Sequence, residues 1–320
     1  MTKIVRERVA IIGAGHVGST AAFALMLRAL FREIVLVDAD EALAQAEAAD
    51  LRDANALARP ARIWAGDYDD AASAGIVILI AGAATHGTED RLSVATHSAQ
   101  IVADCVDRLA ETGFAGILLV AANPVDIMSL VAFERAGLPS ARVIGTGTLL
   151  DTCRLRQNLG AKFGVSPASV HGMIVGEHGN SEVAAFSTVS IGGLPLSESG
   201  FAGIALDRPA VAAEVRDADY RILTGKDYTS FGIAVAIVRI CEAVLRDERV
   251  VLPVSTLLTG QYGLCDIYLS LACILGRGGV EKVLSPAFNK DELARLQASA
   301  QALQAAQLAV SPRSANSRPA

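Results

Sequence analysis

The sequence predicts an α/β protein in which a doubly wound parallel sheet is followed by an α+β domain. In the first half, short apolar runs rich in β-branched residues alternate with longer segments rich in Ala, Leu and charged residues. Apolar runs without polar alternation are typical of strands buried on both faces, and strand–helix alternation is typical of a doubly wound fold. We expect strands over Val9–Ile12, Ile34–Val37, Ile76–Ile80 and Ile117–Val120, and helices over Ser19–Arg32, Glu41–Ala58 and Leu92–Thr112.

The second half has a different pattern. Two apolar runs, Val250–Leu258 and Asp266–Leu275, are followed by a glycine-rich turn over 276–279 and predict an antiparallel segment. We also expect helices over Leu149–Gly160, Ala205–Leu223, Thr229–Asp247 and Asn289–Leu308, and a strand over Val170–Val175. No Pro-rich linker separates the halves, so we expect two domains with a broad interface, over 1–145 and 146–310, and a frayed tail over 311–320.

Composition restricts the class of protein. Of 320 residues, 52% are hydrophobic and 19% charged, so the chain can bury a sizeable core and is not disordered. A net charge of −6 without a basic run argues against nucleic acid as a partner and favours a small molecule. The longest apolar stretch, Ala74–Ala84, is too short to span a bilayer, so no membrane partner is expected.

Cysteine usage and the N-terminus favour a cytoplasmic protein. The five cysteines are widely spaced and form no C-x-x-C, which indicates neither a disulfide framework nor a structural zinc site. A glycine-rich turn follows the N-terminus closely and leaves no room for a signal peptide.

A glycine-rich motif follows the first predicted strand and opens a helix. Small residues at such a turn let the backbone bring a helix N-terminus close to a pyrophosphate, as in a Rossmann domain. Asp38 ends the next predicted strand, where a carboxylate can accept hydrogen bonds from an adenosine ribose; the alternative is a solvated carboxylate. No arginine follows Asp38 to meet a 2′-phosphate, so NAD is favoured over NADP. The cofactor residues expected here are Gly13, Gly15, Val17, Gly18 and Asp38.

The most informative polar residue is His178, in the run Gly176-Glu-His-Gly-Asn-Ser181. It follows an Asp151-x-x-Arg154 pair. Imidazole exchanges protons near neutral pH, a carboxylate can orient the ring, and a guanidinium can bind a substrate carboxylate at two points. These groups suit chemistry on a small 2-oxo or 2-hydroxy acid. The alternative is a structural histidine beside a surface ion pair at i, i+3.

Several motifs in one register over residues 5–308 resemble the lactate/malate dehydrogenase family of NAD-dependent L-2-hydroxyacid dehydrogenases. The resemblance implies reversible hydride transfer between NADH and a 2-oxo acid. The matching stretches are Gly13–Gly18, Asp38, Ala81–Ala83 with Arg91, Asn123–Asp126, Gly145–Arg156, Gly176–Gly179 and Lys226–Ile233.

The resemblance implies a role for each residue. His178 would exchange a proton with the substrate oxygen, Asp151 would fix its tautomer and raise its proton affinity, and Arg154 would bind the substrate carboxylate. Arg91 would lie on a loop that closes over the substrate and excludes water; alternatively it is an ordinary loop charge. The other residues expected at the site are Asn123 at the nicotinamide, Thr229 and Ile233 lining the pocket, and Ala81 and Gly82 beside the cofactor.

The closing loop carries the substrate discriminator in this family. Malate enzymes place an arginine there and many lactate enzymes a glutamine, whereas the matching position here is Thr85. Glu89 and Asp90 would repel a dicarboxylate, and an unpaired buried carboxylate costs several kcal/mol, so we expect a 2-oxo monocarboxylate, with malate as the alternative if His86 supplies a cation. Asn180, where many lactate enzymes carry Asp, and the altered loop are more similar to the branch acting on 2-hydroxyisocaproate.

A second site and an oligomer are also implied. Arg156 and His171 match positions that help to bind fructose 1,6-bisphosphate between subunits of bacterial lactate dehydrogenases, which would imply a sugar bisphosphate effector. The alternative, which we favour slightly, is that each residue serves packing or a subunit contact. The family is oligomeric, which implies a homodimer or homotetramer.

Two other classes of function remain. An NAD-dependent glycoside hydrolase shares the cofactor fold but would need a metal near the nicotinamide. Cys153 lies near the expected site, yet no added metal cluster is apparent, and we expect no metal. A catalytically silent NAD-sensing protein would not need His178, Asp151, Arg154 and Arg91 together.

Overall fold

The computed structural model describes residues 4–83, 91–196 and 205–310. Nine strands form one sheet in the order β14-β13-β12-β6-β5-β4-β1-β2-β3, in which the strands from the first half pair in parallel and the last three are antiparallel. The strands are β1 (Val5–Ile12), β2 (Glu33–Val37), β3 (Arg62–Ala65), β4 (Ala74–Leu79), β5 (Ile117–Val120), β6 (Val143–Gly145), β12 (Val250–Thr259), β13 (Cys265–Gly276) and β14 (Gly279–Val283).

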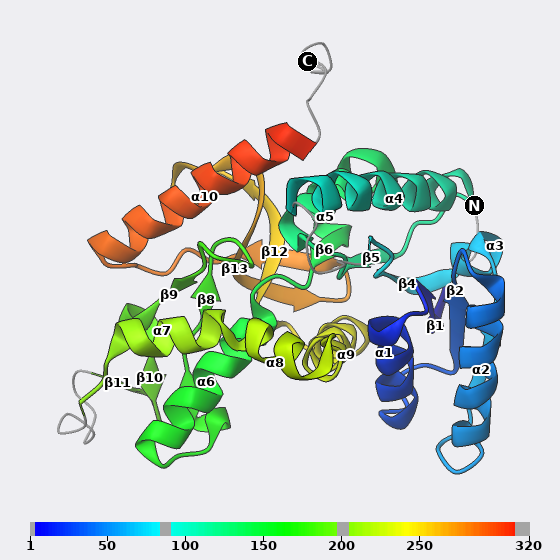
Figure 1. The fold of residues 1–320 in the computed structure, drawn as a ribbon, viewed down its shortest axis with the longest axis horizontal. Helices are drawn as coiled ribbons and strands as arrows, with labels where there is room; N and C mark the ends of the chain where they lie inside the picture. The colour runs from blue at the N-terminus through cyan, green and yellow to red at the C-terminus, as the bar shows by residue number, and fades with distance from the viewer. Residues whose placement is uncertain (1–3, 84–90, 197–204, 311–320) are drawn as a thin grey trace.

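Helices cover both faces of this sheet (Figure 1). Successive strand residues point to opposite faces, so Ala10 and Ile12 of β1 belong to one buried cluster and Val9 and Ile11 to another. The first cluster packs against α4 (Arg91–Glu111), α5 (Val125–Ala136) and α10 (Lys290–Val310), and the second against α1 (His16–Leu27), α2 (Glu41–Asn55) and α9 (Phe231–Arg246). The expected doubly wound arrangement is confirmed.

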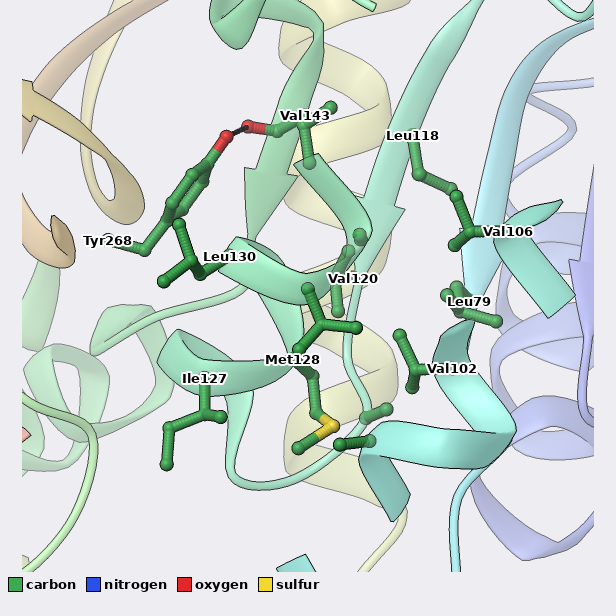
Figure 2. Packing of buried hydrophobic residues seen from close by; sticks show 14 of the residues in the cluster. Leu79, Val102, Val106, Leu118, Val120, Ile127, Met128, Leu130, Val143 and Tyr268 are labelled. Carbon is green, nitrogen blue, oxygen red and sulfur yellow. Dashed lines mark hydrogen bonds between the residues drawn. The ribbon is translucent and has the colours of Figure 1, made fainter. Parts of the chain in front are cut away.

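The last three strands extend the first-half sheet. Strand β12 pairs with β6 through Ser255 and Gly145. Tyr268 of β13, fully buried, reaches across β12 and donates a hydrogen bond to the Val143 carbonyl of β6 at 3.3 Å (Figure 2). The two halves of the chain therefore share one hydrophobic layer.

Two predicted elements are each divided in the structure. The strand expected over Val170–Val175 is wrong as one unit: it splits around Gly172 into β7 (Val170–His171) and β8 (Ile174–Val175), which pair with different partners, β10 (Ser190–Ile191) and β9 (Val183–Ala184). The helix expected over Ala205–Leu223 is interrupted at Asp217 and becomes α7 (Arg208–Arg216) and α8 (Ala218–Lys226). Helix α7 begins only at Arg208 because the Asp207 carboxylate caps the Ala210 amide at 3.0 Å.

The sequence does not predict several elements. Helix α5 is buried around most of its circumference, so it shows no amphipathic periodicity, and β6 has only three residues. The other elements that it does not predict are β3, β9, β10, β14, α3 (Tyr68–Ala72), β11 (Leu194–Pro195) and four short 3-10 turns over Ser140–Arg142, Pro167–Ser169, Phe186–Thr188 and Gln261–Gly263. Helix α6 (Leu149–Phe163) agrees with its prediction. Within the described ranges, no helix is both long and apolar enough to cross a membrane.

The turn between β13 and β14 supplies a stability test. Gly279 has a φ of +99°, and a Cβ there would lie 1.9 Å from the carbonyl oxygen of Ala141. Gly279→Ala should lower the free energy of unfolding by about 1–3 kcal/mol because of the strained backbone and the close contact. Gly278→Ala is the matched control, since a Cβ there meets no described atom within 4 Å. Urea unfolding of both variants checks this, and equal stabilities would contradict it.

Candidate active site

Helix α6 and strand β8 hold the central residues together. Asp151 and Arg154 lie one turn apart on α6, and β8 leads into the loop that carries His178. Threonine side chains fasten the two elements: the Thr152 hydroxyl accepts a hydrogen bond from the Ile174 amide at 2.8 Å, and the Thr148 hydroxyl donates to the Ile174 carbonyl at 2.7 Å. The position of His178 is therefore set by buried backbone contacts with the helix that carries its partner.

The three predicted catalytic and substrate groups form one cluster. Nδ1 of His178 lies 2.6 Å from Oδ2 of Asp151, and Nη1 of Arg154 donates to Oδ1 of the same carboxylate at 3.0 Å. Asp151 is 2% exposed, whereas His178 is 20% exposed. One carboxylate thus holds both cations, and contact through Nδ1 leaves Nε2 of His178 as the nitrogen available to a substrate.

The electrostatics of the cluster favour the imidazolium. Burial alone would lower the pKa of His178, but contact with Asp151 and the nearby charges of Asp126 and Asp219 outweigh burial and raise its pKa to about 9. Burial alone would raise the pKa of Asp151, but His178 and Arg154 hold it below its usual range. At neutral pH the pair is therefore an imidazolium beside a carboxylate, which is able to protonate a ketone oxygen.

A second carboxylate orients the His178 backbone. Asp126, 1% exposed on α5, accepts a hydrogen bond from the His178 amide at 2.8 Å and another from the Ser255 hydroxyl at 2.5 Å. Burial raises the pKa of Asp126 to about 6, against the opposing effect of these hydrogen bonds. The sequence assigns no role to Asp126, although a lone acid in the apolar run of α5 is a signal of a buried polar partner.

Two more carboxyl groups at the site are not predicted by the sequence. Glu182 lies four residues after His178. One carboxylate oxygen of Asp151, one of Glu182 and a ring nitrogen of His178 all lie within 4.8 Å of one another. Burial and the charge of Asp151 raise the pKa of Glu182 to about 8, which favours its neutral form at pH 7. Asp219, on α8, accepts a hydrogen bond from Nη2 of Arg154. Its place in the sequence carries no signal, because α8 and α6 are brought together only by the fold.

The glycine-rich turn has the geometry that the sequence predicts. Gly13 has a φ of +106°, and a Cβ at Gly18 would lie 1.8 Å from the Gly13 carbonyl oxygen, so both positions require glycine. Gly15 is exposed at the N-terminus of α1, where no described side chain caps the helix and a Cβ would meet no described atom within 4 Å. This open helix terminus fits a pyrophosphate. The remaining residue of the expected set, Val17, is partly buried in the first turn of α1.

Asp38 fastens this turn to the next strand. Its Oδ2 accepts from the Ala14 amide at 2.6 Å and its Oδ1 from the Asp40 amide at 2.9 Å. Each carboxylate oxygen can accept a further bond, so Asp38 is positioned both to hold the turn and to meet a ribose diol.

The α8–α9 loop lies beside the glycine-rich turn. The ring of His16 stacks on Tyr228 with centroids 4.0 Å apart, and Thr229 follows Tyr228 directly. Asn123 is exposed before a cis peptide to Pro124 at the start of α5, and Ala81 and Gly82 follow β4. Thr229 and Ile233 are partly buried.

The other predicted residues either lie away from the His178 cluster or belong to the part of the chain that the structure does not describe. Thr85 and the loop over 84–90 lie outside the described residues, and only the backbone of Arg91 is described, at the start of α4. Nε of Arg156 donates to the Gly172 carbonyl at 3.1 Å, next to the exposed His171, so this predicted pair lies together on α6 and β7. Burial lowers the pKa of Arg156.

Comparison with known proteins gives a consistent result along the whole chain. Two family models match, described as the lactate/malate dehydrogenase NAD binding domain over residues 7–145 and the lactate/malate dehydrogenase alpha/beta C-terminal domain over 148–310. An L-lactate dehydrogenase of Clostridium botulinum is 40% identical over 92% of this chain and 94% of that protein, and L-lactate dehydrogenase 2 of Enterococcus faecalis is 38% identical over 97% and 99%. A crystal structure of a minor L-lactate dehydrogenase of Enterococcus mundtii, in a ligands-bound form, superposes with a TM-score of 0.91 at 37% identity, covering 94% and 98% of the two chains. The chain therefore belongs to the lactate/malate dehydrogenase family.

Proposed function

We propose that the protein is an NAD-dependent L-lactate dehydrogenase that reversibly reduces a 2-oxo monocarboxylate. The observation that carries this proposal is the Asp151 carboxylate held at 2.6 Å from His178 and 3.0 Å from Arg154. That arrangement places a proton donor and a carboxylate-binding cation at one site. The named relatives, which are L-lactate dehydrogenases, support the same activity.

The chain's own residues divide the work as follows. Arg154 binds the substrate carboxylate, and the His178 imidazolium donates its Nε2 proton to the ketone oxygen during reduction. Asp151 stabilises that imidazolium and holds the ring in one orientation. The turn over Gly13–Gly18, with Asp38, would hold NAD, which supplies or accepts the hydride when bound. In the oxidation direction, neutral His178 accepts the proton of the substrate hydroxyl.

We propose Arg91, Asn123, Thr85 and Thr229 as further contacts around the reacting atoms. Arg91 would add positive charge at the carbonyl when its loop closes, and Asn123 would face the nicotinamide side. The exposure of Asn123 supports this assignment.

The charge around the site favours a monocarboxylate over malate. The Asp219 carboxylate lies against Arg154, beside His178, and Thr85 brings no cation. A second substrate carboxylate would therefore lack a partner in this region, which is costly in a partly buried site. Malate remains the alternative substrate of the reverse reaction.

We also propose a cytoplasmic homodimer or homotetramer. Large apolar side chains are exposed on the adjacent helices α1 and α9, which supports a subunit contact over these two helices. They are Phe23, Leu27, Phe231 and Val235. All five cysteines are free thiols, which is consistent with a reducing compartment. A sugar bisphosphate bound by Arg156 and His171 stays a proposal, supported by their adjacency.

The substrate is tested by NADH oxidation with pyruvate, oxaloacetate and 2-oxoisocaproate in parallel. We expect pyruvate or 2-oxoisocaproate to give the highest kcat/KM, because the site offers one carboxylate-binding cation. A preference for oxaloacetate would contradict the monocarboxylate assignment, and no turnover with any of the three would contradict the proposed function.

The proton donor is tested by His178→Ala. Loss of general acid–base catalysis should lower kcat by about 10²–10⁴-fold, while NADH binding, followed by fluorescence, should persist because the glycine-rich turn is untouched. The exposed His97, on α4, provides a matched control as His97→Ala. Near-normal turnover by His178→Ala would exclude His178 as the donor.

The pKa of His178 predicts opposite pH profiles in the two directions. Ketone reduction needs the imidazolium, so kcat/KM for reduction should stay level up to pH of about 9 and fall above it. Alcohol oxidation needs neutral imidazole and should rise towards the same pH. Asp151→Asn removes the charge that raises this pKa. The fall in the reduction rate and the rise in the oxidation rate should therefore both move to lower pH. Initial rates of reduction and oxidation, measured across the pH range, check this prediction. Profiles that do not move in the variant would contradict it.

A further inference from the structure

Arg154, the proposed carboxylate-binding group, is paired with a second carboxylate besides Asp151. Nη1 of Arg154 binds Asp151, and Nη2 binds Asp219 from a different helix. The Arg154 side chain is 14% exposed and that of Asp219 32% exposed, so the contact is partly shielded from water. Burial alone would lower the pKa of Arg154, but Asp219 and Asp151 outweigh it and raise its pKa.

The two carboxylates differ in how firmly they are held. Asp151 is 2% exposed, lies on the same helix as Arg154 and also binds His178. Asp219 comes from α8, a helix of nine residues, all described, none of which is buried. A helix with so little buried surface can shift or open at a low cost in free energy. Asp219 is therefore the partner that can leave Arg154.

The charge balance gives Asp219 a consequence for substrate binding. With Asp219 in place, the formal charges of Arg154, His178, Asp151 and Asp219 sum to zero when His178 is protonated. A substrate carboxylate would add an uncompensated negative charge beside Asp219. With Asp219 removed, the three side chains that remain paired, Arg154, His178 and Asp151, carry one more positive charge than before, and the charge of Asp126 is the same in both states. The change therefore favours a monocarboxylate.

We infer that Asp219 takes the place of the substrate carboxylate on Arg154 in the substrate-free enzyme and must release the guanidinium before a 2-oxo acid can bind. This inference rests on the proposed function, because it assumes that Arg154 is the carboxylate-binding group. Asp219 acts on substrate binding through Arg154. Only the fraction of molecules whose Arg154 is free binds substrate, so the apparent affinity is lowered by that fraction.

The test is the affinity for oxamate, which is isosteric with pyruvate, measured by calorimetry on the enzyme with NADH bound. Asp219→Asn keeps the size of the side chain and removes its charge, so oxamate should bind about three- to tenfold more tightly. Michaelis–Menten kinetics with pyruvate should show KM falling by a larger factor than kcat changes. Asp217→Asn is the control, since Asp217 lies two residues away, is 56% exposed and pairs with Arg216 at 3.5 Å instead.

A second measurement does not depend on the proposed reaction. Phenylglyoxal modifies free guanidinium groups, and peptide mass spectrometry can follow Arg154. Modification of Arg154 should be faster in Asp219→Asn than in Asp217→Asn, and oxamate should slow it in both.

The outcomes separate the two ideas. Unchanged or weaker oxamate binding by Asp219→Asn would overturn the inference and make Asp219 a residue that holds Arg154 in its productive position. An unchanged modification rate of Arg154 would also overturn it. If neither the unaltered enzyme nor the variant binds oxamate or turns over any 2-oxo acid, the proposed function fails, and the modification rate still decides whether Asp219 occupies Arg154.

Discussion

One buried carboxylate, Asp151, holds together the groups on which the site depends. Its two oxygens face different cations, His178 at 2.6 Å and Arg154 at 3.0 Å. Without it, burial would favour neutral imidazole, and the partly buried guanidinium of Arg154 would keep only Asp219 as a paired counter-charge. The carboxylate therefore both sets the protonation state of the acid and fixes the spacing between the acid and the carboxylate-binding group.

The continuous sheet fixes the position of the His178 backbone. Strand β12 joins β6 at the edge of the parallel sheet, which brings Ser255 against Asp126 on α5. Asp126 in turn accepts a hydrogen bond from the backbone amide of His178. The chain of contacts from the sheet to the His178 backbone thus crosses from one half of the sequence to the other. This explains why the halves cannot be treated as independent supports, although each matches its own family model.

The limits of sequence reasoning follow from its reliance on periodicity and spacing. The four buried strands of the first half and most helices were predictable because their apolar patterns are local. Helix α5 was missed because it is apolar on nearly all sides, and the strand expected over Val170–Val175 divides because its two ends pair with different strands. Among site residues, the motifs contain His178, Asp151 and Arg154, whereas Asp219 belongs to no motif and reaches Arg154 only through the packing of α8.

The sequence by itself determined the fold class, and it predicted the cofactor turn and the proposed proton donor with its two partners, since each is encoded by residue types at short, recognisable spacings. Only the tertiary structure decided how the charges around them balance. Whether a carboxyl group is buried, paired or facing a cation depends on elements distant in sequence, and burial and contact set its pKa. For this reason the neutral form of Glu182, the anchoring by Asp126 and the occupation of Arg154 by Asp219 became visible only in the folded protein.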